Sequence, residues 1–313
     1  MSDLLVISGG AVGAVMLYFG ADLLVKGGVA IAAKLRIPSL VVGLTLVAFG
    51  TSAPELVVSI LSAISGNGDI SVGNVIGSNV CNLGLILGLC ALIRPLKIND
   101  NMLKLDLWGL LFSAAVLGTW LYVNNGIGRI GSGLLLLIAA VYLTLLFRNA
   151  KKDRDRTEKS AAAPTAPLYL GLVWFFSGML LLIFGAKLFV NGAVRISQLL
   201  GMSEAVIGIT IVAFGTSLPE LATSCGATIK GEDDIASGNI IGSNIWNILC
   251  IMGIAPMIRP IELHSVFPVD VLALGIFALS TLLILFSPRR ISRWIGAVWL
   301  TEYLLYTVLL LTR

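Results

Sequence analysis

The chain has 313 residues, of which 57% are hydrophobic and only 12% are charged, and its mean hydropathy is +0.97. A soluble domain needs a more polar surface than this composition can supply, so a water-soluble globular protein is excluded. The net charge of +4 comes from basic residues scattered at helix ends, which gives no patch for nucleic acid. We expect an all-α integral membrane protein whose partner is the lipid bilayer.

Apolar stretches long enough to cross a hydrocarbon core of roughly 30 Å follow one another along the chain. Ten helices are expected, near residues 4–34, 38–65, 70–94, 105–123, 130–148, 167–199, 204–229, 235–258, 267–287 and 294–312. The longest polar stretch, 148–159, is rich in Lys and Arg, which marks it as cytoplasmic. This rule predicts a multi-pass protein of the cell (inner) membrane with both termini outside the cytoplasm.

The sequence repeats itself at an offset of 165 residues. Residues 41–60 match residues 206–225 at 13 of 20 positions. Because five helices per copy is an odd number, the second copy must enter the membrane from the opposite side, and inverted repeats are typical of transporters. We expect a first five-helix repeat at 1–148 with its motifs at 41–95, a cytoplasmic linker at 149–166, and a second five-helix repeat at 167–313 with its motifs at 206–260.

The first repeated motif, Val-Ala-Phe-Gly-Thr-Ser-x-Pro-Glu-Leu, places a helix breaker and an acid inside an apolar helix at 47–56 and 212–221. Pro54 has no N–H, so we expect carbonyls from Ala48 to Thr51 to lack helical partners. A carboxylate at membrane depth is costly unless it is paired. We therefore expect a bound cation, with candidate ligands on one helix face in each copy: Thr51, Ser52 and Glu55, and Thr216, Ser217 and Glu220.

The second motif, Gly-Asn-x-Ile-Gly-Ser-Asn-x-x-Asn, adds Ser78 with Asn82 and Ser243 with Asn247, each pair four residues apart on one face. Its glycines at 73, 77, 238 and 242 are expected to permit close helix approach. The four cysteines lie in apolar helices without CxxC spacing, which favours small buried side chains over disulfides or zinc ligands. The candidate ligands of the two motifs are all oxygen atoms, and hard oxygen ligands suit calcium and sodium.

The paired GTSxPE and GNxIGSNxxN segments resemble the alpha-repeats of the cation/calcium exchanger superfamily, sodium/calcium exchanger branch, in a minimal prokaryotic form. The resemblance implies electrogenic antiport by alternating access, with no cofactor and with calcium and sodium ions as the transported species. It implies calcium binding by Glu55, Glu220 and the carbonyls of Thr51 and Thr216. It also implies sodium sites made by Ser52, Ser78, Ser217 and Ser243 with the carbonyls of Ala48 and Ala213, and Asn82 and Asn247 facing the centre.

Three other functions are alternatives to sodium/calcium exchange. A proton/calcium antiporter would use the same two glutamates as proton carriers, and it would need no sodium. A cation channel usually has rotational rather than inverted symmetry. An intramembrane enzyme would need a water-activating ligand set that the motifs lack, so we expect no enzymatic activity. The sequence is compatible with a monomer and does not define the oligomeric state.

Overall fold

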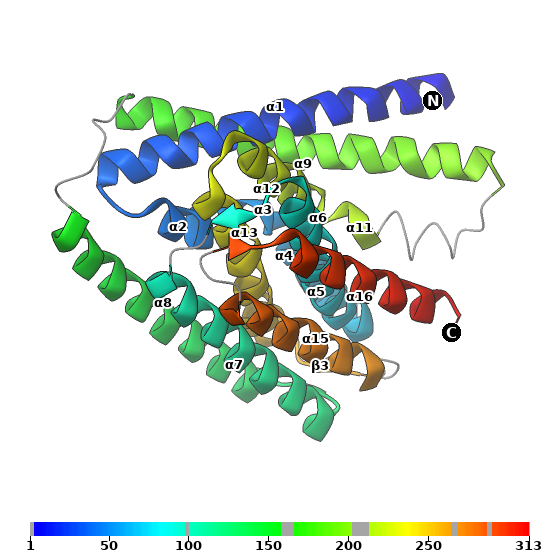
Figure 1. Cartoon of the computed structure of the whole chain (residues 1–313). Coiled ribbons are helices and arrows are strands. Elements are labelled where there is room, and N and C mark those ends of the chain that lie inside the picture. The colour runs from blue at the N-terminus through cyan, green and yellow to red at the C-terminus, as the bar shows by residue number, and fades with distance from the viewer. Residues whose placement is uncertain are drawn as a thin grey trace.

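The computed structural model describes residues 3–97, 100–157, 166–201, 213–263, 268–286 and 290–312. Helices occupy nearly all of this part of the chain (Figure 1). Helix lies in every range where the sequence predicts it, although the predicted residues 204–212 of the seventh range fall outside the described part. Among the described residues, six helical segments are long and apolar enough to cross a membrane, or seven if the bent segment described below counts as one span.

The first half of the chain begins with the long helix α1 (Asp3–Leu35). A broken segment follows: α2 (Ser39–Val42), the π-helical turn η1 (Gly43–Val47), α3 (Ala48–Thr51) and α4 (Ala53–Ile64). Next come α5 (Gly68–Val80), the π-helical η2 (Cys81–Ile86) and α6 (Leu87–Ile93). The half ends with α7 (Asp100–Asn124) and α8 (Arg129–Thr157).

The described elements of the second half follow a similar order. It begins with the long helix α9 (Leu168–Leu199) and continues with α11 (Ala213–Gly215) and α12 (Leu218–Lys230). Then follow α13 (Asp233–Trp246), the π-helical η4 (Asn247–Ile251) and α14 (Met252–Ile258). The last elements are α15 (Pro268–Ser280), the 3-10 turn η5 (Thr281–Phe286) and α16 (Arg293–Leu311).

Two very short antiparallel ladders join the halves, and the sequence analysis did not predict them. β1 (Leu96–Lys97) pairs with β4 (Arg290–Ile291), and β2 (Gly126–Ile127) pairs with β3 (Ile261–Glu262). Each ladder pairs a strand of the first half with one of the second. The ladders therefore tie loops of the two halves together outside the helices.

The centre of the molecule is formed by the third helical segment of each half. In the most apolar 18-residue stretches within 68–93 and 233–258, 72% and 78% of the residues are buried, whereas 28% are buried in the corresponding stretches of α1 and α9. Figure 1 shows α1 and α9 side by side across one face of the remaining helices. The central segments therefore make the core, and α1 and α9 cover it from outside.

Glycine brings α1 and α9 into backbone contact along their antiparallel course. A Cβ on Gly13 would lie 2.5 Å from the Phe189 nitrogen, and a Cβ on Gly178 would lie 2.5 Å from the Leu24 nitrogen. Such distances are shorter than any real carbon contact, so larger side chains at these positions would force the helices apart. Small residues often pair helices in lipid, because close packing must hold the helices together where the hydrophobic effect does not.

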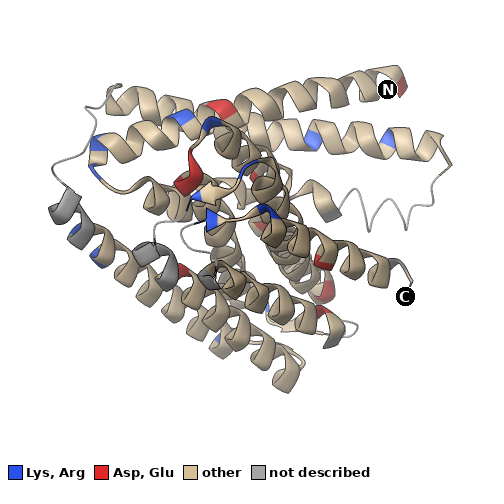
Figure 2. Cartoon of the chain, viewed as in Figure 1, with Lys and Arg blue, Asp and Glu red and all other residues tan. Residues whose placement is uncertain are grey.

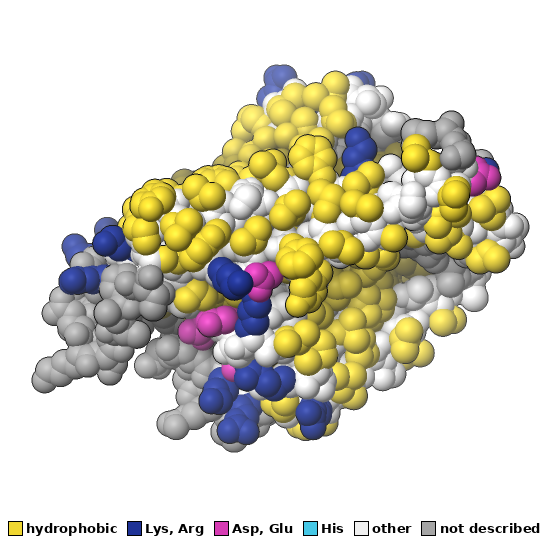
Figure 3. Space-filling model, turned by 90° about the horizontal axis from the view of Figure 1, so that it is seen from above, with side chains coloured by type: hydrophobic (Ala, Val, Ile, Leu, Met, Phe, Trp, Pro, Cys, Tyr) yellow, Lys and Arg dark blue, Asp and Glu magenta, His cyan; other side chains and the backbone are white. Residues whose placement is uncertain are grey.

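The outer surface is apolar, as a lipid environment requires. Charged residues are sparse along the helices (Figure 2). Figure 3 looks onto the face formed by α1 and α9, where hydrophobic side chains cover most of the described surface. Large exposed side chains on these two helices include Leu4, Val12, Tyr18, Phe19, Tyr169, Val173, Phe176 and Phe184. This exposure would be unfavourable in water and is favourable in hydrocarbon.

Candidate functional site

A break in the second helical segment positions the first carboxylate. α3 ends at Thr51, Ser52 leaves helical geometry with φ −82° and ψ 7°, and α4 starts at Ala53 in a direction bent by 47°. Pro54 is near the start of α4, where its missing N–H removes no helical bond. Glu55 then lies in the first turn of α4, at the positive end of the helix dipole.

The second half repeats this arrangement. Ser217 has φ −87° and ψ 6°, α12 starts at Leu218, and Glu220 lies in its first turn. Ala213 is the first residue of α11, directly after residues that the structure does not describe. The repeated motif therefore produces the same local structure in both halves, which is a helix that restarts at the acid.

The expectation of unpaired carbonyls before Pro54 is wrong for Ala48. Its carbonyl accepts a hydrogen bond from the Ser52 N–H at 3.0 Å, because the helix ends only at Thr51, three residues before the proline. Ser243 Oγ donates a second, longer bond of 3.5 Å to the same carbonyl. The Ala48 carbonyl nonetheless borders the site, since Ser243 also donates to a carboxylate there.

The two carboxylates are fully buried and are bonded crosswise by serines. Ser52 Oγ donates to Glu220 Oε1 at 2.9 Å, and Ser217 Oγ donates to Glu55 Oε1 at 3.3 Å. Each serine thus belongs to the opposite half from the acid that it contacts. Residues Ser78 and Ser243 add bonds of 3.5 Å to Glu55 Oε1 and 3.4 Å to Glu220 Oε1. Both predicted Ser/Glu sets therefore meet in one site.

Each carboxylate keeps one oxygen without a partner. Within the described part of the chain, Oε2 of Glu55 and Oε2 of Glu220 accept no hydrogen bond, and the ion pairs found there all involve other acids. Burying a carboxylate without a compensating charge costs several kcal/mol or more by most accounts. Bound cations would therefore stabilise two such groups at one site.

The hydroxyls of Thr51 and Thr216 have different surroundings. Thr51 Oγ1 donates to Asn239 Oδ1 at 3.0 Å and lies 3.4 Å from Ser243 Oγ, so it is tied to the opposite half. Thr216 Oγ1 is buried and forms no hydrogen bond within the described residues, which do not include the residue one helical turn before it.

Asn82 and Asn247 lie where the central segments change from α-helix to π-helix. Asn82 is the second residue of η2, and Asn247 is the first residue of η4. Both side chains are fully buried, and neither their nitrogen nor their oxygen has a partner in the described structure. π-Helical turns often mark functional sites. Buried amides without protein partners are suited to bind ions or water.

Sequence reasoning missed two asparagines that position these segments. Asn74 Nδ2 donates to the Glu55 carbonyl at 3.2 Å and to Ser59 Oγ at 3.0 Å. Asn239 Nδ2 donates to Ser224 Oγ at 2.9 Å while its oxygen accepts the Thr51 hydroxyl. Both occupy the second position of the Gly-Asn-x-Ile-Gly-Ser-Asn motif, so the repeat itself was the signal that could have identified them.

The expectation that these glycines permit close helix approach is confirmed in the second half. A Cβ on Gly242 would lie 2.6 Å from the Leu44 carbonyl oxygen, and one on Gly238 would lie 2.8 Å from the Leu40 carbonyl oxygen. These glycines therefore let α13 pack closely against α2 and η1. For Gly73 and Gly77, the corresponding neighbours would lie at 205–209, outside the described residues, so the expectation there stays a prediction.

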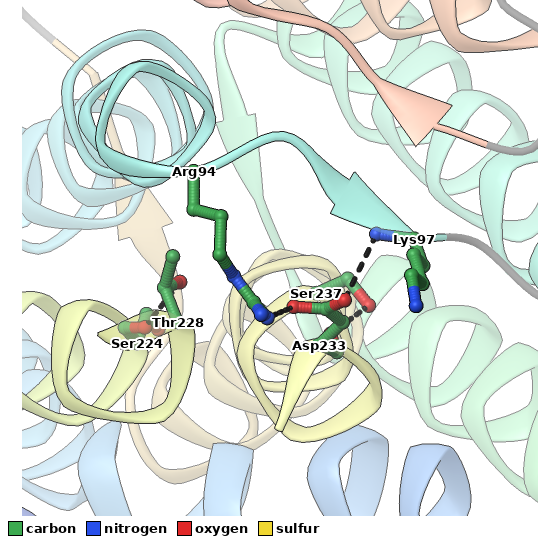
Figure 4. A network of polar contacts seen from close by, with 6 residues as sticks. All are labelled: Arg94, Lys97, Ser224, Thr228, Asp233 and Ser237. Atoms are coloured by element: carbon green, nitrogen blue, oxygen red, sulfur yellow. Dashed lines mark hydrogen bonds and ion pairs between the residues drawn. The ribbon is translucent and has the colours of Figure 1, made fainter. Parts of the chain in front are cut away.

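A polar network lies at the N-terminal end of α13 (Figure 4). Arg94, just after α6, makes an ion pair with Asp233, and the Lys97 N–H donates to the other Asp233 oxygen at 3.1 Å. The corresponding arginine of the second half, Arg259, donates to the Ile64 carbonyl instead. Each arginine lies beside a glycine with positive φ, Gly231 for Arg94 and Gly66 for Arg259, and these glycines are also 165 residues apart.

The site therefore offers oxygen ligands of three kinds: carboxylates, hydroxyls and amides. Zinc and copper prefer nitrogen and sulfur ligands, so this oxygen set suits them poorly. Calcium and sodium are bound by oxygen ligands of this type.

Comparison with known proteins agrees with this chemistry. The family model described as "Sodium/calcium exchanger protein" matches the chain twice, at residues 5–148 and 170–312. The chain belongs to this family. It is accordingly a multi-pass membrane protein of a transporter family.

Individual relatives extend over almost the whole chain. A putative antiporter, CaxA, of Alkalimonas amylolytica is 38% identical over 96% of each chain. The sodium/calcium exchanger MaX1 of Methanosarcina acetivorans is 35% identical over 95% of this chain and 96% of its own. Among solved structures, the sodium-calcium exchanger NCX_Mj without Na⁺ and Ca²⁺ superimposes with a TM-score of 0.85 at 32% identity, covering 99% of this chain and 100% of that one.

Proposed function

We propose that this protein exchanges sodium for calcium across the membrane at the site between Glu55 and Glu220. The observation that carries the proposal is the pair of buried carboxylates, each bonded by a serine of the opposite half and neither paired with a basic residue among the described residues. Calcium or sodium would supply the missing positive charge. Membership of the sodium/calcium exchanger family supports the same pair of ions.

The proposed ligands follow the two motifs. Calcium is held by Glu55 and Glu220 with the backbone carbonyls of Thr51 and Thr216. Sodium is held by the hydroxyl and carbonyl oxygens next to the carboxylates, and Asn82 and Asn247 face the central position. The full sodium set is Ser52, Ser78, Ser217 and Ser243 with the carbonyls of Ala48 and Ala213.

Charge supports electrogenic exchange. Two carboxylates neutralise one calcium ion, and the central amides Asn82 and Asn247 add no further charge. Three sodium ions in the same site would leave one excess positive charge, so a cycle of three sodium ions against one calcium ion would move net charge. A dependence of the exchange rate on membrane potential is the direct consequence.

We also propose that the ten helical segments all cross the membrane as two inverted five-helix repeats, at 1–148 and 167–313, joined by the cytoplasmic linker 149–166. The double match of the family model supports this division. Further support comes from equivalent contacts 165 residues apart, such as the serine-to-glutamate bonds and the arginines beside Gly231 and Gly66. Such repeats commonly work by alternating access around a site near the midplane.

The test is calcium uptake into proteoliposomes that contain the purified protein. Vesicles loaded with sodium are compared with vesicles loaded with potassium, and with vesicles that carry a pH gradient at equal sodium on both sides. We expect uptake only with internal sodium, because the serine, threonine and amide oxygens next to the carboxylates form sodium sites. Uptake driven by the pH gradient without a sodium gradient would contradict sodium coupling and would make the glutamates proton carriers.

A further inference from the structure

Two thiols from different halves of the chain lie next to each other. Cys90 in α6 and Cys225 in α12 have their sulfur atoms 3.8 Å apart. Cys90 is fully buried, whereas Cys225 is partly exposed. The corresponding positions 165 residues away are Ala255 and Ile60, so the second half has no equivalent pair. This contact could not be predicted from sequence, because the cysteines are 135 residues apart.

The thiol pair lies between the candidate site and one end of the helices. Cys225 follows Glu220 by five residues on α12, and Cys90 follows Asn82 by eight residues on the segment that continues from η2 into α6. Beyond the pair, the Arg94 guanidinium lies beside Gly231, where a Cβ would be 3.4 Å from Nη1. A covalent bond here would tie the helix that carries Glu220 to the segment that carries Asn82.

We propose that Cys90 and Cys225 are a modification site at which a small neutral peroxide forms a disulfide that blocks ion exchange. A disulfide needs a sulfur separation of about 2.05 Å, so the 3.8 Å pair must close by about 1.8 Å through side-chain rotation and small helix shifts. A neutral peroxide can reach a thiol inside a membrane protein, whereas a charged oxidant cannot cross hydrocarbon easily.

The reaction proceeds in two steps that balance. The Cys225 sulfur attacks one peroxide oxygen, the O–O bond breaks, and the leaving hydroxide takes a proton to become water, which leaves Cys225 as a sulfenic acid. The Cys90 sulfur then attacks the Cys225 sulfur, the S–O bond breaks, and a second water leaves with the Cys90 proton. Two thiols lose two electrons in total, and one peroxide is reduced to two waters. Cys225 is the first to react because it is the more exposed of the two.

The prediction that the disulfide blocks transport rests on the proposed function. The prediction that the disulfide forms does not. Ions bound between the halves can leave on alternate sides only if the surrounding helices move. A cross-link from α6 to α12 restrains the helix that supplies Glu220. We therefore expect loss of calcium uptake after oxidation and its return after reduction with dithiothreitol.

The first arm of the test measures the bond directly in the full-length protein. Hydrogen peroxide treatment followed by proteolysis and mass spectrometry should give a linked Cys90–Cys225 peptide that disappears on reduction. Cys90→Ser should give no link and should instead accumulate a dimedone-trapped sulfenic acid at Cys225. Cys81→Ser and Cys250→Ser, the matched controls, should still form the link. Absence of the linked peptide from the wild type, or a link through Cys81 or Cys250, would overturn the proposal.

The second arm measures sodium-driven calcium uptake in proteoliposomes before and after the same treatment. Wild-type uptake should be lost and then restored by dithiothreitol, while Cys90→Ser should be insensitive to peroxide. A linked peptide with unchanged uptake would overturn the inhibitory role of the site. No uptake before any oxidation would contradict the proposed exchange activity instead, and the peptide measurement would still decide whether the thiols react.

Discussion

Equivalent residues of the two halves make different contacts. Arg94 of the first half makes an ion pair with Asp233, whereas Arg259, 165 residues later, donates to the Ile64 carbonyl. The crosswise serine bonds also differ, at 2.9 Å for Ser52 to Glu220 and 3.3 Å for Ser217 to Glu55. The comparison shows that a duplicated sequence can form one shared site while equivalent residues make unequal contacts around it.

The carboxylates are the feature that the two halves share most closely, and their removal should have the largest effect. Glu55→Gln and Glu220→Gln should each abolish sodium-driven calcium uptake, because each removes half of the negative charge that balances calcium. The measurement is uptake of radioactive calcium by vesicles with matched protein content and verified folding. Uptake that persists in both variants would contradict the assignment of the site.

The glycines of α13 test how closely this helix packs against the first half. Gly242→Ala should destabilise the protein by about 1–3 kcal/mol, because the added carbon would meet the Leu44 backbone at 2.6 Å. Gly133→Ala in α8 is the control and should be neutral or slightly stabilising, because it adds helix propensity and its added carbon would meet the Met257 side chain only at 3.9 Å. Thermal unfolding in one detergent compares the two variants. Equal destabilisation by both substitutions would contradict the close contact between Gly242 and Leu44.

The crosswise serines test how strongly each half depends on the other. Ser52→Ala should weaken sodium binding by about 10- to 100-fold, because a hydrogen bond to a charged group contributes roughly 1.5–3 kcal/mol. Ser217→Ala should have a smaller effect, because its bond to Glu55 is 3.3 Å long against 2.9 Å for Ser52 to Glu220. The sodium concentration that gives half-maximal exchange is the quantity to measure. A larger increase in this sodium concentration for Ser217→Ala than for Ser52→Ala would contradict the order predicted from the distances.

The threonines should give the smallest difference. Thr51→Val keeps the shape and the backbone carbonyl but removes the bond to Asn239, which should cost about 1 kcal/mol of stability. Thr216→Val removes a buried hydroxyl that forms no hydrogen bond within the described residues, and it should cost less stability than Thr51→Val. Thermal unfolding of the two variants measures this difference. An equal loss of stability in both variants would contradict the difference between the two hydroxyls.

Local chemistry explains why much of the site was predictable from sequence. The proline and acid of the repeated motif define where α4 and α12 start, and the spacing of Ser78 with Asn82 places both on the central segment. The repeat also indicated that the motifs of the two copies lie together in one site. The crosswise pairing of Ser52 with Glu220 needs a particular arrangement of the two copies, which spacing within one motif cannot define.

The remaining features depend on tertiary contacts between residues far apart in the chain. The repeated motif contains no signal for the neighbour of Gly242, which is the Leu44 backbone of the other half. The same holds for Cys90 and Cys225, which have no shared motif. The π-helical turns at Asn82 and Asn247 were not predicted either, because the apolar pattern of these segments indicates a helix without defining its hydrogen-bond spacing.

The most direct test of the central claim is calorimetric titration of calcium into the purified protein, with and without sodium. One site shared by both halves predicts one calcium ion per chain and an apparent Kd that rises as sodium is added, because both ions use the oxygens around Glu55 and Glu220. Two equivalent calcium ions per chain, or calcium binding that saturating sodium leaves unchanged, would contradict a single shared site.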